Sequence, residues 1–367
     1  MMSFSVVSPS HADIRKAISD FKQRLNEPFD TTRDSTYWKR ALKHAKLNIN
    51  DTTVIYPKFL KFCVNVYRWG DHAFNCYDST YVVSSGKKWK LMIKNNNFLD
   101  LYAGHLVDKQ IPFQVHSDLT SSFGAQICYM AVSVGYMFNV GDLLHGKRIK
   151  NKKFDFSFTC SRIALDFYYH TDDNPMDLDR LGDFKTKTFY RYEFDGVFRK
   201  NYGLYLYYFF NNKRYAQAAA YCYSKIQKKS QGSFILGFNY SHHDITMDFS
   251  RLPDSISKKL TDESVAFKYR DYSLLFGYGY NWVLGKHWLF NVTLTPSIGY
   301  RRAFDYNDDG EGDFCSLNYR AKLALVNNRR RFFYGLHFTT DGSWYVSKRN
   351  SFYCANHDIN VTAGFRF

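Results

Sequence analysis

The stretch Ser241-His242-His243-Asp244 combines the side chains that many hydrolases use for acyl transfer. Such enzymes need a nucleophile, a histidine base and a polar group that orients the base. Ser241, His243 and Asp244 are therefore a candidate site for a lipid-acting enzyme of the phospholipase or acyltransferase type. Neighbouring residues in an extended chain point to opposite faces, and sequence neighbours rarely converge into a triad. The alternative interpretation is a polar strand end at an interface.

A second candidate for chemistry is the acidic stretch "DYNDDGEGDF" at 305–314. Its acidic spacing resembles that of a calcium-binding loop, although the full ligand order and the closing glutamate are missing. The stretch predicts either a weak Ca²⁺ site, which could bridge lipopolysaccharide phosphates, or a solvated loop. The candidate ligands are Asp305, Asp308, Asp309, Glu311 and Asp313.

The elements that carry these residues show a period of two. In 271–284 and 287–300, even positions are large and apolar, while most odd positions are Gly, Ser, Thr or Asn. Segments 233–247, 315–326 and 331–340 alternate in the same way. This alternation is typical of β-strands with one apolar face.

Charge and strand length favour a membrane barrel over a soluble sandwich. The apolar faces of these segments carry no Asp, Glu, Lys or Arg, and a cation on a lipid face costs about 2–4 kcal/mol at mid-bilayer. The segments also have ten or more residues, the length that crosses a bilayer when tilted. We therefore predict an all-β, transmembrane antiparallel β-barrel. A soluble, secreted, aromatic-rich β-sandwich remains the alternative fold.

Counting backwards from Phe367 gives about twelve candidate strands, an even number as closed single-chain barrels have. The candidates are 357–367, 331–341, 315–327, 287–301, 271–284, 233–247, 214–224, 203–210, 187–198, 154–170, 124–140 and 88–104. Their connections largely alternate between long and short. Long loops outside and short periplasmic turns are typical of the outer membrane, so we predict that both termini are periplasmic.

Composition supports this location and argues against nucleic acid as a partner. The chain has 367 residues, 19 % aromatic residues and a net charge of +16. The basic residues of 199–202, 225–232, 328–330 and the 141–153 connection fall on the predicted short-turn side, and the long loops are acidic. The excess is therefore interpreted as a periplasmic rim, not a nucleic-acid groove. Seven dispersed cysteines without a C-x-x-C pair argue against a disulfide framework or a zinc site.

The first residues differ in pattern from the rest. Residues 1–12 end in a small-residue spacing typical of a cleavage site, which predicts the remnant of a signal peptide; an ordinary cytosolic terminus is the alternative. Ile14, Ile18, Phe21 and Leu25 recur at helical spacing, which predicts a mainly helical periplasmic segment at 13–86. The barrel is then expected at 87–367.

The last strand and the inward face suggest two further sites. An outward stripe of Ile359, Val361, Phe365 and Phe367 resembles the terminal signal read by the barrel-assembly machinery. Charged residues on the opposite face include four basic side chains on three consecutive strands. These are Arg320, Lys322, His337 and Arg366. In an open lumen they would favour anions; alternatively they pair with acidic residues such as Asp271 and fill the interior.

Three stretches carry a family resemblance: "FNCYDSTYVV" (74–83), "YYFFNNKRYAQAAAY" (207–221) and "QKKSQGSFILG" (227–237). Over roughly residues 55–367, the chain resembles the Bacteroidetes outer-membrane family catalogued as domain of unknown function 4421 (DUF4421). The resemblance implies an outer-membrane barrel and gives no reaction.

The sequence therefore predicts an integral outer-membrane barrel without evident catalytic machinery, acting as a pore, a scaffold or a component of an outer-membrane complex. A lipid-acting enzyme is the alternative. The expected partners are outer-membrane lipid and lipopolysaccharide, the barrel-assembly machinery, and other outer-membrane or periplasmic proteins.

Overall fold

The structure is a computed structural model that describes most of the chain. The described residues are 27–28, 30–44, 46–48, 51–87, 89–106, 110–129, 132–139, 151–186, 192–253, 264–304, 312–346 and 351–367. The chain divides into two compact units, Met1–Asn75 and Cys76–Phe367. The sequence placed this boundary between residues 86 and 87.

The first unit contains two helices, α2 (Tyr37–Lys43) and α3 (Lys58–Phe74). Helix α3 begins after Pro57, whose missing N–H group is no loss at a helix start. Tyr37, Ala41 and Val54 form a small buried core. The predicted helical positions between Ile14 and Leu25 lie outside the described residues. Among the helices that the structure describes, none is both long and apolar enough to cross a membrane.

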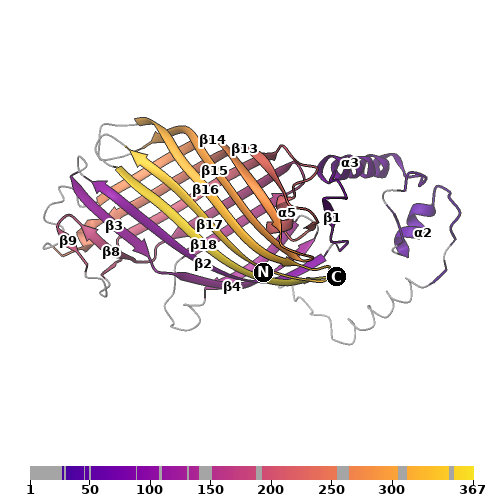
Figure 1. Ribbon diagram of the computed structural model, residues 1–367, viewed down its shortest axis with the longest axis horizontal. Helices are drawn as coiled ribbons and strands as arrows, with labels where there is room; N and C mark the ends of the chain where they lie inside the picture. The colour runs from indigo at the N-terminus through magenta and orange to yellow at the C-terminus, as the bar shows by residue number, and fades with distance from the viewer. Residues whose placement is uncertain are drawn as a thin grey trace, which may run out of the picture. The chain divides into compact units, whose positions relative to one another are not determined.

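The second unit is a barrel whose wall has twelve antiparallel strands (Figure 1). They are β2 (Trp89–Leu106), β4 (Thr120–Tyr129), β5 (Val132–Asn139), β6 (Asn151–Thr159), β7 (Ile163–Asp172), β11 (Val197–Phe209), β13 (Gln231–Asp248), β14 (Ser264–Val283), β15 (Trp288–Ala303), β16 (Gly312–Asn328), β17 (Phe332–Val346) and β18 (Ser351–Arg366). The last strand, β18, pairs with the first, β2, from Ser351↔His105 to Arg366↔Lys90. At the remaining seam β5 lies beside β6, and in the described residues no ladder joins them. The predicted antiparallel barrel of about twelve strands is confirmed.

The strand count is right, although five of the predicted segments differ from the strands of the structure. Segments 124–140 and 154–170 are each a hairpin, because the chain turns after Tyr129 and at Cys160. The Ile163 N–H group donates to the Cys160 sulfur across this second turn. Segment 203–210 lies almost entirely in β11, which also takes in the last two residues of 187–198. Glu193–Phe194 form β10, and 187–191 lie outside the described residues. Segment 214–224 is no strand and contains helix α5 (Gln217–Tyr221).

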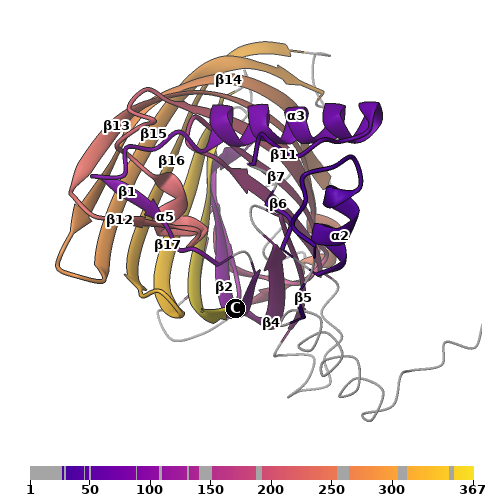
Figure 2. The ribbon, with the colours of Figure 1, turned by 90° about the vertical axis from the view of Figure 1, so that its right-hand side faces the viewer.

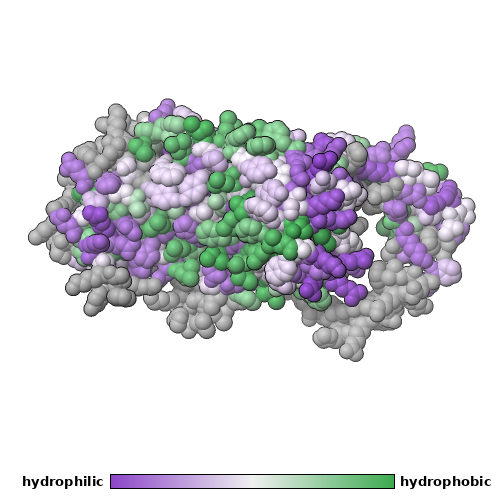
Figure 3. Space-filling view, viewed as in Figure 1, coloured by the Kyte–Doolittle hydropathy of each residue, from purple (hydrophilic) through white to green (hydrophobic). Residues whose placement is uncertain are grey.

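The two faces of the wall differ as the alternation predicts. On β14, Leu274 and Phe276 point outward and are 63 % and 61 % exposed, whereas Ser273 and Asn281 point inward and are fully buried. Exposed Leu, Ile, Phe, Tyr and Trp side chains occur on eleven of the twelve strands, whereas the side chains of β7 are half-buried or buried. On the face of the barrel that Figure 3 shows, apolar side chains form a band between hydrophilic ends. The outer surface is thus suited to contact lipid.

We call the end of the barrel at which β13 ends and β14 begins the long-loop end. It carries a second group of strands. Strand β2 pairs with β4 over Trp89–Phe98 and with β3 (Ile111–Ser117) over Leu101–Leu106. Strand β3 then pairs with β8 (Met176–Leu181), which pairs with β9 (Phe184–Lys185) and β10 (Glu193–Phe194). Near the end of β13 a 3-10 helix, η1, covers Phe249–Arg251. These elements line the mouth at this end.

The opposite end of the barrel, which we call the short-turn end, holds the C-terminus and a small inner sheet. Strands β1 (Val82–Ser84) and β12 (Lys225–Gln227) pair with each other. Figure 2 views the barrel from this end and shows β1, β12 and α5 within the outline of the barrel. The segment between β11 and β13 therefore folds back into the lumen.

Candidate functional site

The interior of the barrel is built around buried ion pairs, and the first joins neighbouring strands. Asp271 on β14 lies opposite Arg301 on β15 in the ladder. The Arg301 Nη2 atom is 2.6 Å from Asp271 Oδ2, and each side chain is 2 % exposed. Ser316 also donates to Asp271, and Arg301 donates to the Trp344 carbonyl. A buried charge is tolerated only with such partners.

A second ion-pair group reaches across the lumen. Arg199 on β11 donates to Asp172 on the neighbouring β7 and to Asp100 on β2, each over 2.6 Å. Strand β2 is not a neighbour of β11. The sequence placed Arg199 in a short turn at 199–202, but β11 continues through it and the side chain is buried.

A third group links other opposite walls. Lys322 on β16 donates to Asp166 on β7 over 2.9 Å, and Arg320 contacts Asp341 over 3.1 Å. Lys153 on β6 reaches Asp358 on β18 over 2.9 Å. The partners Lys322 and Asp166, like Lys153 and Asp358, belong to strands that do not pair. Side chains therefore span the barrel at several points.

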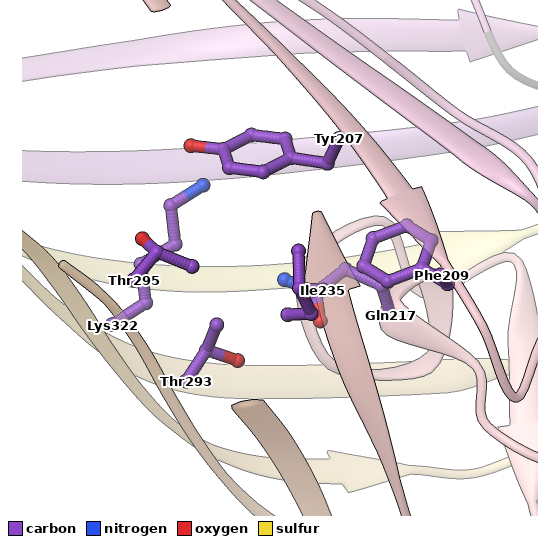
Figure 4. A pocket seen from close by; sticks show the side chains of 7 residues that line it. All are labelled: Tyr207, Phe209, Gln217, Ile235, Thr293, Thr295 and Lys322. Atoms are coloured by element: carbon purple, nitrogen blue, oxygen red, sulfur yellow. The ribbon is translucent and has the colours of Figure 1, made fainter. Parts of the chain in front are cut away.

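A cavity of about 10 Å³ lies within this packing, which is room for about one water molecule. Figure 4 shows the Lys322 ammonium beneath the ring of Tyr207, with threonines below and Gln217 of α5 at one side. The full lining is Tyr207, Phe209, Gln217, Ile235, Thr293, Thr295 and Lys322. A space of this size offers no passage for a solute.

Residues 214–230, which we call the plug, pack inside the short-turn mouth. Ala218, Ala219 and Ala220 of α5 are buried, and so are Tyr215 and Tyr223. Small side chains allow the helix backbone to lie close to the wall. The plug thus packs as part of the barrel core.

Inward glycines make room for the plug tyrosines. A Cβ atom at Gly335 would lie 2.6 Å from Tyr223 Oη, and one at Gly279 would lie 2.5 Å from Tyr215 Oη. Tyr223 itself has φ of 55°, a left-handed conformation that bulky residues rarely adopt. Its ring stacks on Phe333 with centroids 4.4 Å apart. The fit between plug and wall is therefore specific.

The long-loop mouth is closed by an apolar core. Its inward residues include Ile245, Phe267 and Tyr269 from the wall, packed against Leu178 of β8 and Phe249 of η1. All five are at most 1 % exposed. Burial of this apolar surface stabilises the cap over the mouth. Described residues thus pack inside both ends of the lumen.

The four predicted basic residues all point into this interior. Arg320 and Lys322 contact acidic residues, as described above. His337 Nε2 lies 3.2 Å from Tyr223 Oη and 3.1 Å from the Ala220 carbonyl oxygen. Arg366 donates to Asn328 Oδ1 over 2.5 Å and to the Tyr223 carbonyl. Two of the four therefore hold the plug, and two belong to the spanning ion pairs.

The candidate catalytic residues lie near the long-loop end of β13 without forming a triad. His243 Nδ1 is 3.1 Å from Asn201 Oδ1, and its ring stacks on Tyr269. Asp244 contacts Lys268 over 3.6 Å. Ser241 is buried at 6 % exposure. Among these described side chains, no hydrogen bond joins serine to histidine or histidine to aspartate.

Most of the predicted calcium ligands fall outside the described residues: Asp305, Asp308, Asp309 and Glu311. Asp313 is described, and its Oδ1 atom accepts a hydrogen bond from Tyr300 over 2.5 Å. Within the described part of the chain, no three His, Cys, Asp or Glu side chains are grouped to hold a metal ion.

The C-terminal stripe lies on the outer surface. Ile359, Val361, Phe365 and Phe367 are between 41 % and 53 % exposed. The Phe367 ring stacks on Trp89 of β2, with centroids 6.4 Å apart. The final residue thus contacts the first strand of the barrel.

Sequence reasoning missed Arg301, the plug and the cross-lumen partners. Arg301 has the inward phase of its strand, which could have identified it. The plug could have been suspected from the run of three alanines in 218–220.

Comparison with known proteins gives one family and several distant folds. The family described as "Domain of unknown function (DUF4421)" matches residues 76–367. Among curated proteins, no sequence match was found.

Several solved structures are similar in fold. The outer-membrane protease OmpT from Escherichia coli is 8 % identical, with a TM-score of 0.38 over 78 % of this chain and 98 % of that one. The translocator domain of the autotransporter NalP from Neisseria meningitidis is 8 % identical, with a TM-score of 0.32 over 84 % and 96 %. OprG from Pseudomonas aeruginosa is 12 % identical, with a TM-score of 0.25 over 78 % and 99 %. Because the family match covers most of the length of this chain, the chain belongs to the DUF4421 family.

Proposed function

We propose that this protein is an outer-membrane β-barrel with a closed lumen, and that it acts as a membrane-embedded scaffold and not as a conducting pore. The observation that carries the proposal is the contact of Arg199 with carboxylates on both β7 and β2. A charged side chain that bonds to two walls, together with the packed plug and the apolar core at the long-loop mouth, supports a closed lumen.

The membrane location is supported by the outer face of the barrel. Apolar side chains ring the wall, whereas the charges of the central strands pair inside it. This arrangement suits a lipid surround, because lipid-facing cations are destabilising at mid-bilayer. We further propose that the short-turn end and both termini are periplasmic.

The site geometry gives no support to the lipid-acting enzyme. Ser241 is buried, and His243 is bonded to Asn201 and stacked on Tyr269. A nucleophile needs a base within hydrogen-bond reach and access to its substrate. A scaffold needs neither, and the long-loop lobe of β3, β8, β9 and β10 offers a rigid surface for other outer-membrane proteins.

The test is conductance of the purified, folded protein in planar bilayers, with a general porin as the positive control. We expect no steady current from the wild-type barrel under voltages at which the porin conducts. Stable current steps that scale with the amount of inserted protein would overturn the proposal. Location is tested separately by carbonate extraction and by the labelling of an epitope placed in 254–263 on intact cells.

A further inference from the structure

Helix α3 carries an exposed apolar face that the barrel scaffold does not explain. Phe59, Phe62, Val66 and Trp69 are 75 %, 65 %, 49 % and 67 % exposed. Their spacing of three and four residues places them on one side of the helix. Soluble surfaces rarely expose a contiguous stripe of this size, so this face is suited to a binding partner.

The charges of the helix indicate what that partner is. Lys58 and Lys61 are exposed and lie outside the sector that holds the apolar stripe. A helix with basic residues on one face and Phe, Val and Trp on the other is typical of segments that lie in the interface of an anionic membrane. The rings enter the acyl boundary, while the lysines stay among the headgroups.

The chain connection also favours a lipid surface over a soluble partner. Helix α3 ends at Phe74, and the barrel unit starts at Cys76. Within the barrel unit, the Asp78 N–H group donates to the Lys213 carbonyl over 2.8 Å at the short-turn end. The helix is therefore joined by a short linker to the end of the barrel that enters the periplasmic side of the bilayer.

We infer that α3 is an interfacial anchor that binds the surface of an anionic phospholipid bilayer. This inference rests on the proposed membrane location. The tether makes binding of the helix intramolecular, so a helix that binds lipid weakly alone is held on the surface.

The experiment uses the full chain with a single environment-sensitive fluorophore. The background variant carries Cys76→Ser, Cys222→Ser and Cys315→Ser, which leaves Cys63 as the exposed thiol. Cys63 lies on the apolar half of α3, one turn from both Phe59 and Val66. The matched control carries Cys63→Ser and Asn65→Cys, because Asn65 is exposed and lies on the polar half of the helix, one turn from Lys61 and Arg68. Both are reconstituted into vesicles of equimolar phosphatidylglycerol and phosphatidylcholine with nitroxide-labelled acyl chains.

We expect several-fold stronger nitroxide quenching of the fluorophore at Cys63 than in the Asn65→Cys control. Pure phosphatidylcholine vesicles, or the pair Lys58→Gln and Lys61→Gln in mixed vesicles, should reduce the quenching at Cys63. Equal quenching at both positions, or no dependence on phosphatidylglycerol, would overturn the inference. A concentration-dependent shift without lipid would also overturn it, because it would indicate a second copy of the chain as the partner.

A third labelled position separates this inference from the proposed function. A fluorophore in a Cys63→Ser, Leu274→Cys variant reports on the outward face of β14, where Leu274 is 63 % exposed. Quenching there but not at Cys63 means that the barrel is embedded and the anchor is wrong. No quenching at either position means that the membrane location itself is wrong.

Discussion

Asp271 and Arg301 face each other on adjacent strands, with Oδ2 and Nη2 2.6 Å apart and both side chains almost fully buried. This pair lies among Ser273, Ser316 and Asn318, which also bond to the carboxylate. The charges of the lumen are therefore structural partners of one another, and their removal should be felt as lost stability.

Breaking this pair should be costly. Asp271→Asn leaves Arg301 buried without its counter-charge, and we expect a loss of about 3–5 kcal/mol in the free energy of unfolding. The measurement is urea unfolding in detergent micelles, followed by tryptophan fluorescence. Replacing both residues with apolar side chains should cost less than the single change.

The control for this experiment is the half-buried pair Asp244–Lys268, whose side chains are 32 % and 34 % exposed, against 2 % for Asp271 and Arg301. Asp244→Asn should cost no more than about 1 kcal/mol, as for surface ion pairs. Equal losses for Asp271→Asn and Asp244→Asn would contradict the structural role of the buried pair.

Gly335→Ala should loosen the plug. The added Cβ atom would lie 2.6 Å from Tyr223 Oη and 3.2 Å from a Val326 methyl group, and overpacking of a core costs about 1–3 kcal/mol. We expect faster protease cleavage within 214–230 of the folded protein. Adding Tyr223→Phe removes the nearest atom and should restore part of the protection. Unchanged cleavage in Gly335→Ala would show that the plug does not depend on this fit.

Variants at Phe367 and Trp89 separate the effect of their ring contact on the stability of the folded barrel from the effect of the terminal residue on assembly in the membrane. Deletion of Phe367 and the change Trp89→Ala both remove their ring contact, worth about 0.5–1.5 kcal/mol, so both should lower stability in micelles to a similar extent. If the assembly machinery reads the terminal residue, only the deletion should sharply reduce the amount of folded barrel in membranes. Equal reductions for both variants would mean that the contact alone matters.

Residues 78–84, at the start of the barrel unit, should be less stably folded in acid. Hydrogen bonds from the Thr80 hydroxyl and N–H groups hold the pKa of Asp78 below its usual 3.8. A lowered pKa means that the carboxylate contributes stability above the usual value and loses it as the pH falls through the lowered pKa. Hydrogen-exchange protection of 78–84 should therefore decline in acid. Asp78→Asn should remove this decline, and an unaltered pH profile would refute the role of Asp78.

The outer face was the part of the fold most open to prediction from sequence. Residues such as Leu274 and Phe276 alternate with Ser273 and Gly277 because one face contacts an apolar surround. Local alternation locates β13 to β18, with bounds that differ from those of the structure by up to seven residues.

The interior was harder to predict, because its partners are far apart in the chain. The inward phase of Lys322 was readable, but its contact with Asp166, 156 positions away, depends on the curvature of the whole sheet. The tyrosines of residues 214–224 are spaced as in a strand, so the pattern predicts one. The segment packs inside the barrel instead, because the absence of a side chain at Gly279 and Gly335 leaves room for Tyr215 and Tyr223.

The pairing of β2 with β18 sets an order of events in biogenesis. Asn97 donates to the carbonyl of Ile359, 262 positions away, so the first wall strand gains this neighbour only after the chain as far as Ile359 has been made. Until then β2 exposes an unpaired edge that invites aggregation, and such non-local pairing is slow. We therefore expect the growing chain to stay unfolded until β18 has been made, and truncation within β18 to abolish closure of the whole barrel.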